Sequence, residues 1–409
     1  MRAILLVAAL GLATPAAAFE KPEPYSPPSL TLCDGMSVIA IAWGDHGCIQ
    51  VSGEFVPAMG YDSASGLVAG SSGSARLAAV LDNRSGTAFV LGARLTPDWF
   101  GSTGGFFTKE TPSLSEAFFS TGTALQFRAG LLDAEFDSLD QTTEPTWLTT
   151  LGPFLDPDST SIEYDLPIGG YSVQLLARSE SGFSVGLGAE NLDGRPTMTC
   201  WPIPCSGGTA AGTVIATARY DGDSLTADFT ALAGGVLDGN IERWAAKGGV
   251  DYRDGIVEIL SRGSYENESG WTGLLSASLN FGDVTLAGDL GASAGPWGPF
   301  EREIGFSAQV GDTYEGPAIG VGARSAVASD GQSVSQAELF GSTILFEQLQ
   351  LRLGVGAYAQ NSTMFGGEDF YVLPSAVWEF SKTSSVAASI ETHSSGGFKA
   401  VVKADLRTQ

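Results

Sequence analysis

A two-residue alternation of apolar with small or polar side chains constrains this chain more than any other feature. In the longest segment, residues 349–360, Leu, Val and Ala occupy the odd positions, whereas Gln, Arg, Gly and Tyr occupy the even ones. Successive side chains of a strand point to opposite faces, so the pattern predicts β-strands whose two faces meet different surroundings. The same alternation recurs in residues 125–129, 173–178, 183–190, 225–231 and 398–406.

The composition indicates which surroundings the two faces meet. The chain carries a formal charge of −25 but only 16% charged residues, with 54 Gly and a mean hydropathy of +0.11. A soluble acidic protein carries more charge, because water must wet its whole surface. A soluble array of β-sandwiches is the alternative, but its buried faces would be bulkier than the Gly, Ala and Ser found opposite the apolar positions. The fold class that we expect is therefore all-β, a transmembrane antiparallel β-barrel with an apolar band toward lipid.

The connections between the segments support a barrel. Short turns alternate along the chain with longer loops, which is the layout of outer-membrane barrels. In hydrocarbon each unpaired backbone group costs several kcal/mol, so the sheet must close on itself. About twenty candidate segments are present, and we expect sixteen to twenty strands. The short turns fall at residues 83–86, 179–182, 221–223 and 282, and the long loops at 61–72, 96–113, 133–168, 192–212, 234–242 and 361–369.

The start of the chain has the pattern of an export signal. Arg2 precedes eleven apolar residues, 3–13, and the small residues at 16–18 form an Ala-x-Ala cleavage site. Eleven residues are too few to span a bilayer of ~30 Å as a helix, and no apolar stretch of eighteen or more residues follows. We therefore expect a signal peptide at 1–18, a periplasmic N-terminal segment at 19–48 and the barrel at 49–409. Aromatic residues near segment ends fit interfacial girdles: Tyr61, Trp99, Tyr220, Trp244, Trp271 and Trp378.

Four cysteines in an exported chain favour disulfide pairing. The intervals favour Cys33 with Cys48 and Cys200 with Cys205, although four cysteines allow three connectivities and the other two stay open. Zinc binding is the rival interpretation, but the chain has no Cys-x-x-Cys pair. We expect no metal site.

Residues 32–35 and 47–53, Leu-Cys-Asp-Gly and Gly-Cys-Ile-Gln-Val-Ser-Gly, resemble the start of the porin family typical of alphaproteobacteria. Residues 171–191 and 212–231 are similar to that family as well. The resemblance implies a sixteen-stranded barrel in the bacterial outer membrane, a homotrimer, and a third loop that folds inward to narrow the pore. It implies passive diffusion of small hydrophilic solutes through a water-filled channel surrounded by lipid and lipopolysaccharide.

The narrowest part of a pore sets its selectivity, because fixed charges act strongly where low-dielectric walls confine water. The best candidate constriction is the loop after residue 132, whose acids would face arginines on inward-facing strand positions. The net negative charge favours mild cation preference, and loop acids are alternatively ligands for divalent cations that bridge lipopolysaccharide. The acids are Asp137, Asp140, Glu144, Asp156 and Asp158, and the arginines are Arg94, Arg128 and Arg178.

Signals for chemistry are weak. The chain has two histidines, His46 and His393, and residues 291–295 match Gly-x-Ser-x-Gly around Ser293 without a helix to form a nucleophile elbow. Basic patches for nucleic acid are absent, and no cofactor is expected. A non-enzymatic pore is the leading hypothesis. The rivals are a barrel with a plugged lumen that serves as an adhesin or structural anchor, and an outer-membrane lipase.

Overall fold

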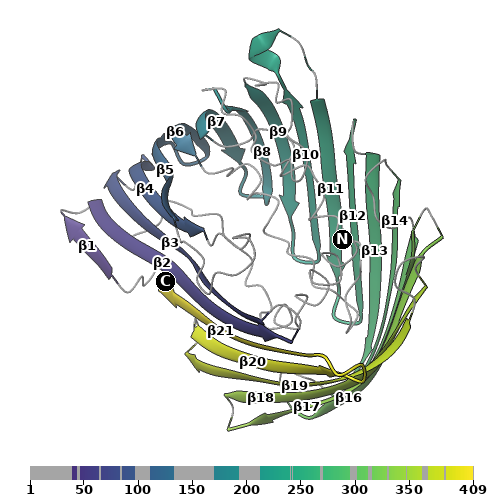
Figure 1. Cartoon of the computed structure of the whole chain (residues 1–409). Helices are drawn as coiled ribbons and strands as arrows, with labels where there is room; N and C mark the ends of the chain where they lie inside the picture. Colours follow the sequence, from purple (N-terminus) through teal and green to yellow (C-terminus); the bar gives the residue numbers. More distant parts are fainter. Residues whose placement is uncertain are drawn as a thin grey trace.

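The computed structural model forms one antiparallel sheet of 21 strands that curls into a barrel (Figure 1). Each strand pairs with its neighbours in chain order, so every connection joins adjacent strands. The residues that the structure describes are 39–43, 47–63, 66–82, 85–96, 111–132, 170–192, 212–239, 241, 243–267, 270–294, 302–311, 316–328, 331–346, 348–361, 367–381 and 384–408.

The strands have the following bounds. The first eleven are β1 (Ile39–Trp43), β2 (Gly47–Asp62), β3 (Gly66–Asp82), β4 (Thr87–Thr96), β5 (Thr111–Thr121), β6 (Leu125–Leu132), β7 (Gly170–Arg178), β8 (Phe183–Glu190), β9 (Thr213–Asp221), β10 (Leu225–Gly234) and β11 (Arg243–Arg253). The other ten are β12 (Val257–Glu266), β13 (Gly270–Phe281), β14 (Val284–Ala294), β15 (Arg302–Val310), β16 (Ala318–Val327), β17 (Ser333–Leu345), β18 (Leu349–Asn361), β19 (Gly367–Ser381), β20 (Ser384–His393) and β21 (Phe398–Thr408). A short 3₁₀-helix, η3 (Val236–Asp238), follows β10.

The ring closes between β2 and β21, which lie side by side as the purple and yellow strands of Figure 1. One edge of β2 pairs with β3. The other pairs with β1 up to Val51 and with β21 from Gly53 onward. The short strand β1 therefore continues the line of β21, and the remaining twenty strands form the ring. The prediction of sixteen strands is therefore wrong. The third loop, which is expected to fold inward, falls in residues 133–169, outside the described residues, so its inward course stays a prediction.

The alternation of the sequence becomes the two faces of this ring. On β6, Leu125 and Phe127 are exposed on the outer face, whereas Gln126 and Arg128 are buried on the inner face. The same phase holds on β7, where Val173 is exposed beside a buried neighbour, and around the rest of the wall. Apolar side chains thus cover the outside, which is the surface that a bilayer solvates.

Aromatic side chains lie near both rims of the outer face. Tyr61, Trp244 and Trp271 are close to one rim, and Tyr220 and Trp378 are close to the other. All five are exposed, as interfacial residues must be. The ring of Tyr61 packs on that of Phe398 across the closing strands, with the ring centroids 5.1 Å apart. Trp99 lies outside the described residues.

Tight turns gather at one rim of the barrel. Between β11 and β12, the Asp254 carboxylate accepts hydrogen bonds from the backbone N–H groups of Ile256 (3.1 Å) and Val257 (2.8 Å). These backbone hydrogen bonds lower the pKa of Asp254 below its usual value. The turn also places Gly255 at a φ of 88°, a conformation that favours glycine.

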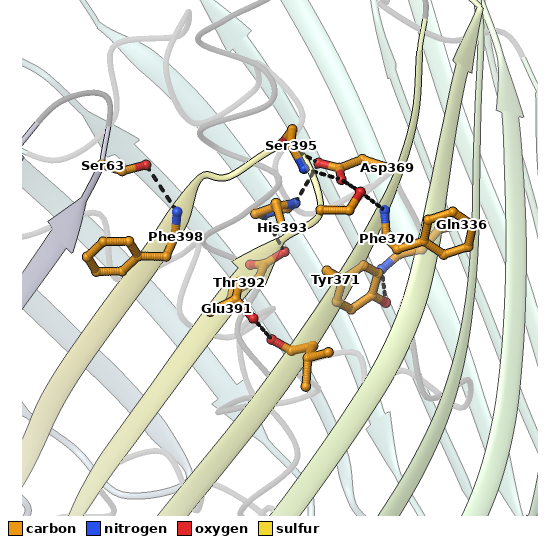
Figure 2. A network of polar contacts seen from close by, with 12 residues as sticks. Ser63, Gln336, Asp369, Phe370, Tyr371, Glu391, Thr392, His393, Ser395 and Phe398 are labelled. Carbon is orange, nitrogen blue, oxygen red and sulfur yellow. Dashed lines mark hydrogen bonds and ion pairs between the residues drawn. The ribbon is translucent and has the colours of Figure 1, made fainter.

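At the opposite rim, the prediction of a long loop at residues 61–72 is wrong. Strand β2 continues to Asp62 and β3 begins at Gly66, so the connection is short. The hydroxyl of Ser63 accepts a hydrogen bond from the backbone N–H of Phe398 (3.0 Å), and the backbone N–H of Ser63 donates to the Phe398 carbonyl (2.9 Å). These two hydrogen bonds connect the turn between β2 and β3 to β21, the last strand (Figure 2 shows the one to the Ser63 hydroxyl).

Two further features concern the described residues. None of their helices is long and apolar enough to cross a bilayer. Cys48, buried in β2, is disulfide-bonded. Cys33, Cys200 and Cys205 lie outside the described residues, so the expected pairing stays a prediction.

Candidate functional site

The inner face of the ring is the candidate functional site, because it collects the polar side chains that the outer face lacks. Acids, bases, amides and hydroxyls line it on nearly every strand. Among the described residues, no three His, Cys, Asp or Glu side chains group as metal ligands. The buried charged residues of this face are Glu116, Arg128, Glu190, Arg219, Lys247, Asp251, Arg262, Glu266, Asp289, Glu303, Arg324 and Glu338.

The three arginines expected at the constriction stand at different levels of the wall. Arg94 pairs in register with Ser113, and Arg128 pairs with Ser120, seven residues farther along β5. At ~3.3 Å per residue this separates the two backbone positions by about 23 Å along the strand direction. Arg178 lies at the end of β7, four residues beyond Gln174, the register partner of Arg128. The structure thus brings no two of them to the same level.

Arg128 packs over an aromatic ring of the inner wall. Its guanidinium carbon lies 5.7 Å from the centroid of Phe118, within the range of a cation–π contact. Arg178 is half-buried at the rim of the tight turns. The five loop acids expected to face these arginines, Asp137, Asp140, Glu144, Asp156 and Asp158, lie outside the described residues. A transverse field between loop and wall therefore stays a prediction.

Basic and acidic side chains of the wall pair with one another. Arg76 on β3 lies 2.9 Å from the carboxylate of Glu116 on β5, and Arg262 on β12 lies 2.5 Å from that of Asp228 on β10. The Arg262 and Asp228 side chains are only 4% and 6% exposed. Arg219 with Asp221 and Arg253 with Asp251 form pairs along single strands. Such pairing satisfies charges that would otherwise be costly to bury.

The most extended polar cluster spans β16 to β19, and we call it the Glu338 network. The two carboxylate oxygens of Glu338 accept hydrogen bonds from Arg352 (2.6 Å) and from the Tyr371 hydroxyl (2.7 Å). Gln336 donates to the Tyr371 hydroxyl (2.8 Å) and accepts from Arg324 (2.9 Å). Four strands are thereby joined through side chains as well as through backbone. Figure 2 shows the contact between Gln336 and Tyr371.

A second cluster lies at the rim where β20 turns into β21. The Asp369 carboxylate accepts hydrogen bonds from the hydroxyls of Ser394 (2.6 Å) and Ser395 (2.9 Å) and from the backbone N–H of Ser395 (3.2 Å). His393 lies between two acids, with Nδ1 3.0 Å from Asp369 and Nε2 3.2 Å from Glu391 (Figure 2). Each ring nitrogen of His393 thus has a carboxylate within hydrogen-bond distance.

Replacing Asp369 should loosen this rim. Asp369→Ala removes the acceptor of the β20–β21 turn, and we expect a loss of about 1–2 kcal/mol, since the carboxylate is partly exposed and charged hydrogen bonds contribute modestly there. The temperature at which the folded barrel unfolds in a heat-modified gel shift measures the loss. Glu368→Ala is the matched control, because Glu368 is the adjacent, exposed residue. Equal unfolding temperatures for both variants would contradict the prediction.

The partners of these clusters come from different strands, which is why the sequence does not reveal them. Arg352 stands out in the alternation as an inward-facing position, but Glu338 and Tyr371 become its neighbours only through the register of three strands. Ser293 lies inside β14 and faces inward, whereas Gly295, the last residue of the Gly-x-Ser-x-Gly match, lies outside the described residues. His393 belongs to the Asp369 cluster.

Comparisons with known proteins find similarity in fold only. No family model and no curated protein matches the chain. A loop-deletion mutant of OmpT, an outer membrane protein of Vibrio cholerae, is 10% identical, with a TM-score of 0.37 over 89% of this chain and 100% of its own. Two mutants of the porin of Rhodopseudomonas blastica are 12% and 13% identical, with TM-scores of 0.40 and 0.39 over 88% of this chain and 99% of theirs. Identities and TM-scores this low do not assign a function to this chain.

The wall itself places the protein in the bacterial outer membrane. In the described residues the antiparallel ladder closes between β2 and β21, the outer face is apolar, and aromatic side chains mark both rims. Closure of the ring pairs strand edges that hydrocarbon would otherwise leave without hydrogen-bond partners, which is the condition for crossing a bilayer with strands. The localisation expected from the sequence is confirmed.

Proposed function

We propose that this protein is a porin, a passive, water-filled channel for small hydrophilic solutes and ions. The observation that carries the proposal is a closed ring of twenty strands with a polar inner face. The diameter of a barrel grows with its strand number, and wall side chains fill the interior only near eight strands. Barrels of 16–18 strands already leave an aqueous channel, so a ring of this size encloses more space than its wall residues fill.

Three further observations support a porin. The chain begins with the pattern of an export signal, and its cysteine segment resembles that of alphaproteobacterial porins. The connections at one rim are all short, whereas the opposite rim has both short and long ones. In outer-membrane barrels the short turns face the periplasm, which would direct the opposite rim to the cell exterior. A homotrimer embedded in lipid and lipopolysaccharide is the assembly that the resemblance favours.

Reconstitution into planar bilayers tests the channel. We expect stepwise current openings from the folded protein, and none from a heat-denatured sample of the same preparation. A formal charge of −25 raises the local concentration of cations, so the reversal potential across a salt gradient should show mild cation preference. Folded protein that inserts into the bilayer without passing current would refute the channel.

A specific observation favours the rival, a membrane anchor or adhesin with a plugged lumen. Acids and bases of the inner wall are secluded from solvent, with Asp289 exposed by 1% and Glu338 by 5%. A plugged lumen would exclude water from such groups, whereas in an open lumen neighbouring side chains of the wall must cover them. The bilayer experiment separates the two functions, because a plugged barrel inserts silently.

A further inference from the structure

Several polar contacts of the inner wall join side chains of two strands that are separated by a third strand. In each case a glycine of the third strand lies beneath the contact. At one level of the wall, Arg76 on β3, Gly92 on β4 and Glu116 on β5 are partners in register. The ion pair between Arg76 and Glu116 therefore passes over the intervening strand at Gly92. Strands pair ~4.8 Å apart, so side chains that meet across three strands must span about 10 Å along the wall.

The same arrangement recurs on the far side of the ring. Asp228 on β10, Gly249 on β11 and Arg262 on β12 stand in register, and Arg262 reaches across Gly249 to Asp228.

In the Glu338 network the Tyr371 hydroxyl on β19 reaches Glu338 on β17 across Gly356 on β18. Asp289, Gly305 and Arg324 form a fourth row of the same kind by register.

Each of these glycines is required by space and not by backbone conformation. None of the four is among the described glycines with positive φ. A Cβ on Gly249 would lie 1.9 Å from Nη1 of Arg262, and one on Gly92 would lie 2.3 Å from Cγ of Glu116. On Gly305 it would lie 1.9 Å from Oδ2 of Asp289, and on Gly356 it would lie 2.2 Å from Cζ of Tyr371. A side chain at any of these positions would displace the one that now lies over it.

We infer that Gly92, Gly249, Gly305 and Gly356 are positioning residues of the channel, which keep charged and polar side chains flat along the wall and out of the solute path. The inference rests on the proposed channel function. Without the glycine, a guanidinium or carboxylate has to turn toward the lumen, where it narrows the cross-section and loses its partner. The glycines would thus set the pore width without carrying any charge themselves.

Single-channel conductance of Gly249→Ala tests the inference. The net charge is unchanged, and Arg262 should be displaced into the lumen, so we expect a loss of conductance relative to wild type. Gly263→Ala is the matched control. Gly263 lies on β12 next to Arg262, and a Cβ there would meet only the carbonyl oxygen of Thr272 at 3.7 Å. This control should conduct as wild type does.

A rescue variant separates positioning from general damage to the fold. Gly249→Ala combined with Asp228→Asn and Arg262→Ser keeps the net charge but shortens the displaced side chain. Its conductance should return to at least the wild-type value. If Gly249→Ala fails to fold, Gly92→Ala gives the same comparison, because the flexible Glu116 side chain is the group that must move.

The outcomes distinguish this inference from the channel itself. A wild-type protein that inserts without passing current overturns both. Wild-type current with unchanged conductance in Gly249→Ala and Gly92→Ala overturns the positioning role alone, as does a rescue variant that stays at the reduced conductance.

Discussion

Val402→Arg should prevent most of the protein from folding into lipid vesicles. Val402 lies near the middle of β21, on the outer face, where it is 43% exposed. A charged side chain toward lipid costs ~2–4 kcal/mol near the bilayer midplane. Because β21 also closes the ring against β2, the penalty falls on the strand pair that completes the barrel. The folded fraction, read from heat-modified gel migration after dilution into vesicles, measures the effect.

Val401→Arg is the matched control for that substitution. Val401 precedes Val402 on the same strand and faces inward, opposite Gly60 and Ser389, which leave room for a longer side chain. The control should fold nearly as well as wild type, because its guanidinium points to the polar face. Equal folding of the two variants, or worse folding of Val401→Arg, would contradict the assignment of faces.

Glu338→Gln should produce the second large effect, a loss of about 3 kcal/mol in the free energy of unfolding. Removing one partner of a buried ion pair leaves the other charge uncompensated, which typically costs 3–5 kcal/mol. The Glu338 and Arg352 side chains are 4% and 17% exposed, so we take the lower end of that range. Denaturant titration of the vesicle-bound protein gives the loss.

Two further variants test the cause of that loss. Glu379→Gln changes an exposed acid at the end of β19 and should have little effect. Glu338→Gln with Arg352→Gln removes both charges and should recover part of the stability, since the unpaired guanidinium is gone. A double variant less stable than Glu338→Gln would show that the buried charge is not the main cost.

The two faces of the wall are predictable from the sequence, because the side chains of each strand alternate between apolar residues toward lipid and small or polar residues toward the lumen. Residues 349–360 alternate for twelve positions, and β18 exposes Leu353 and Val355 while burying Gly354 and Gly356. Aromatic residues at segment ends mark the rims for the same reason. These properties are local, and no knowledge of the neighbouring strand is needed.

The strand number could not be predicted in this way. Sixteen came from the resemblance to porins, whereas the alternating segments themselves numbered about twenty, nearer to the 21 strands of the sheet. Residues 66–74 appear loop-like because they are rich in Gly, Ala and Ser, yet they pair with β2 along their whole length. Pairing with β2 stabilises their strand conformation, and their own side chains do not show the apolar–polar alternation that would predict it.

The contacts of the inner wall depend on register, which the sequence leaves undefined. Arg128 and Arg178 are visible as inward-facing positions, but their different levels appear only once β6 and β7 are aligned. The Asp228–Arg262 pair joins strands that are not even neighbours, and its glycine looks like any other in a chain with 54 of them.

A cysteine scan along β20 tests the central claim, that one face of every strand meets lipid and the other faces the lumen. Single cysteines at positions 386–390, labelled with an environment-sensitive fluorophore, are exposed in vesicles to a quencher carried on lipid tails. Quenching should be strong at Val386, Ala388 and Ile390 and weak at Ala387 and Ser389, with a period of two residues. Uniform quenching, or strong quenching at Ala387 and Ser389 alone, would contradict the account.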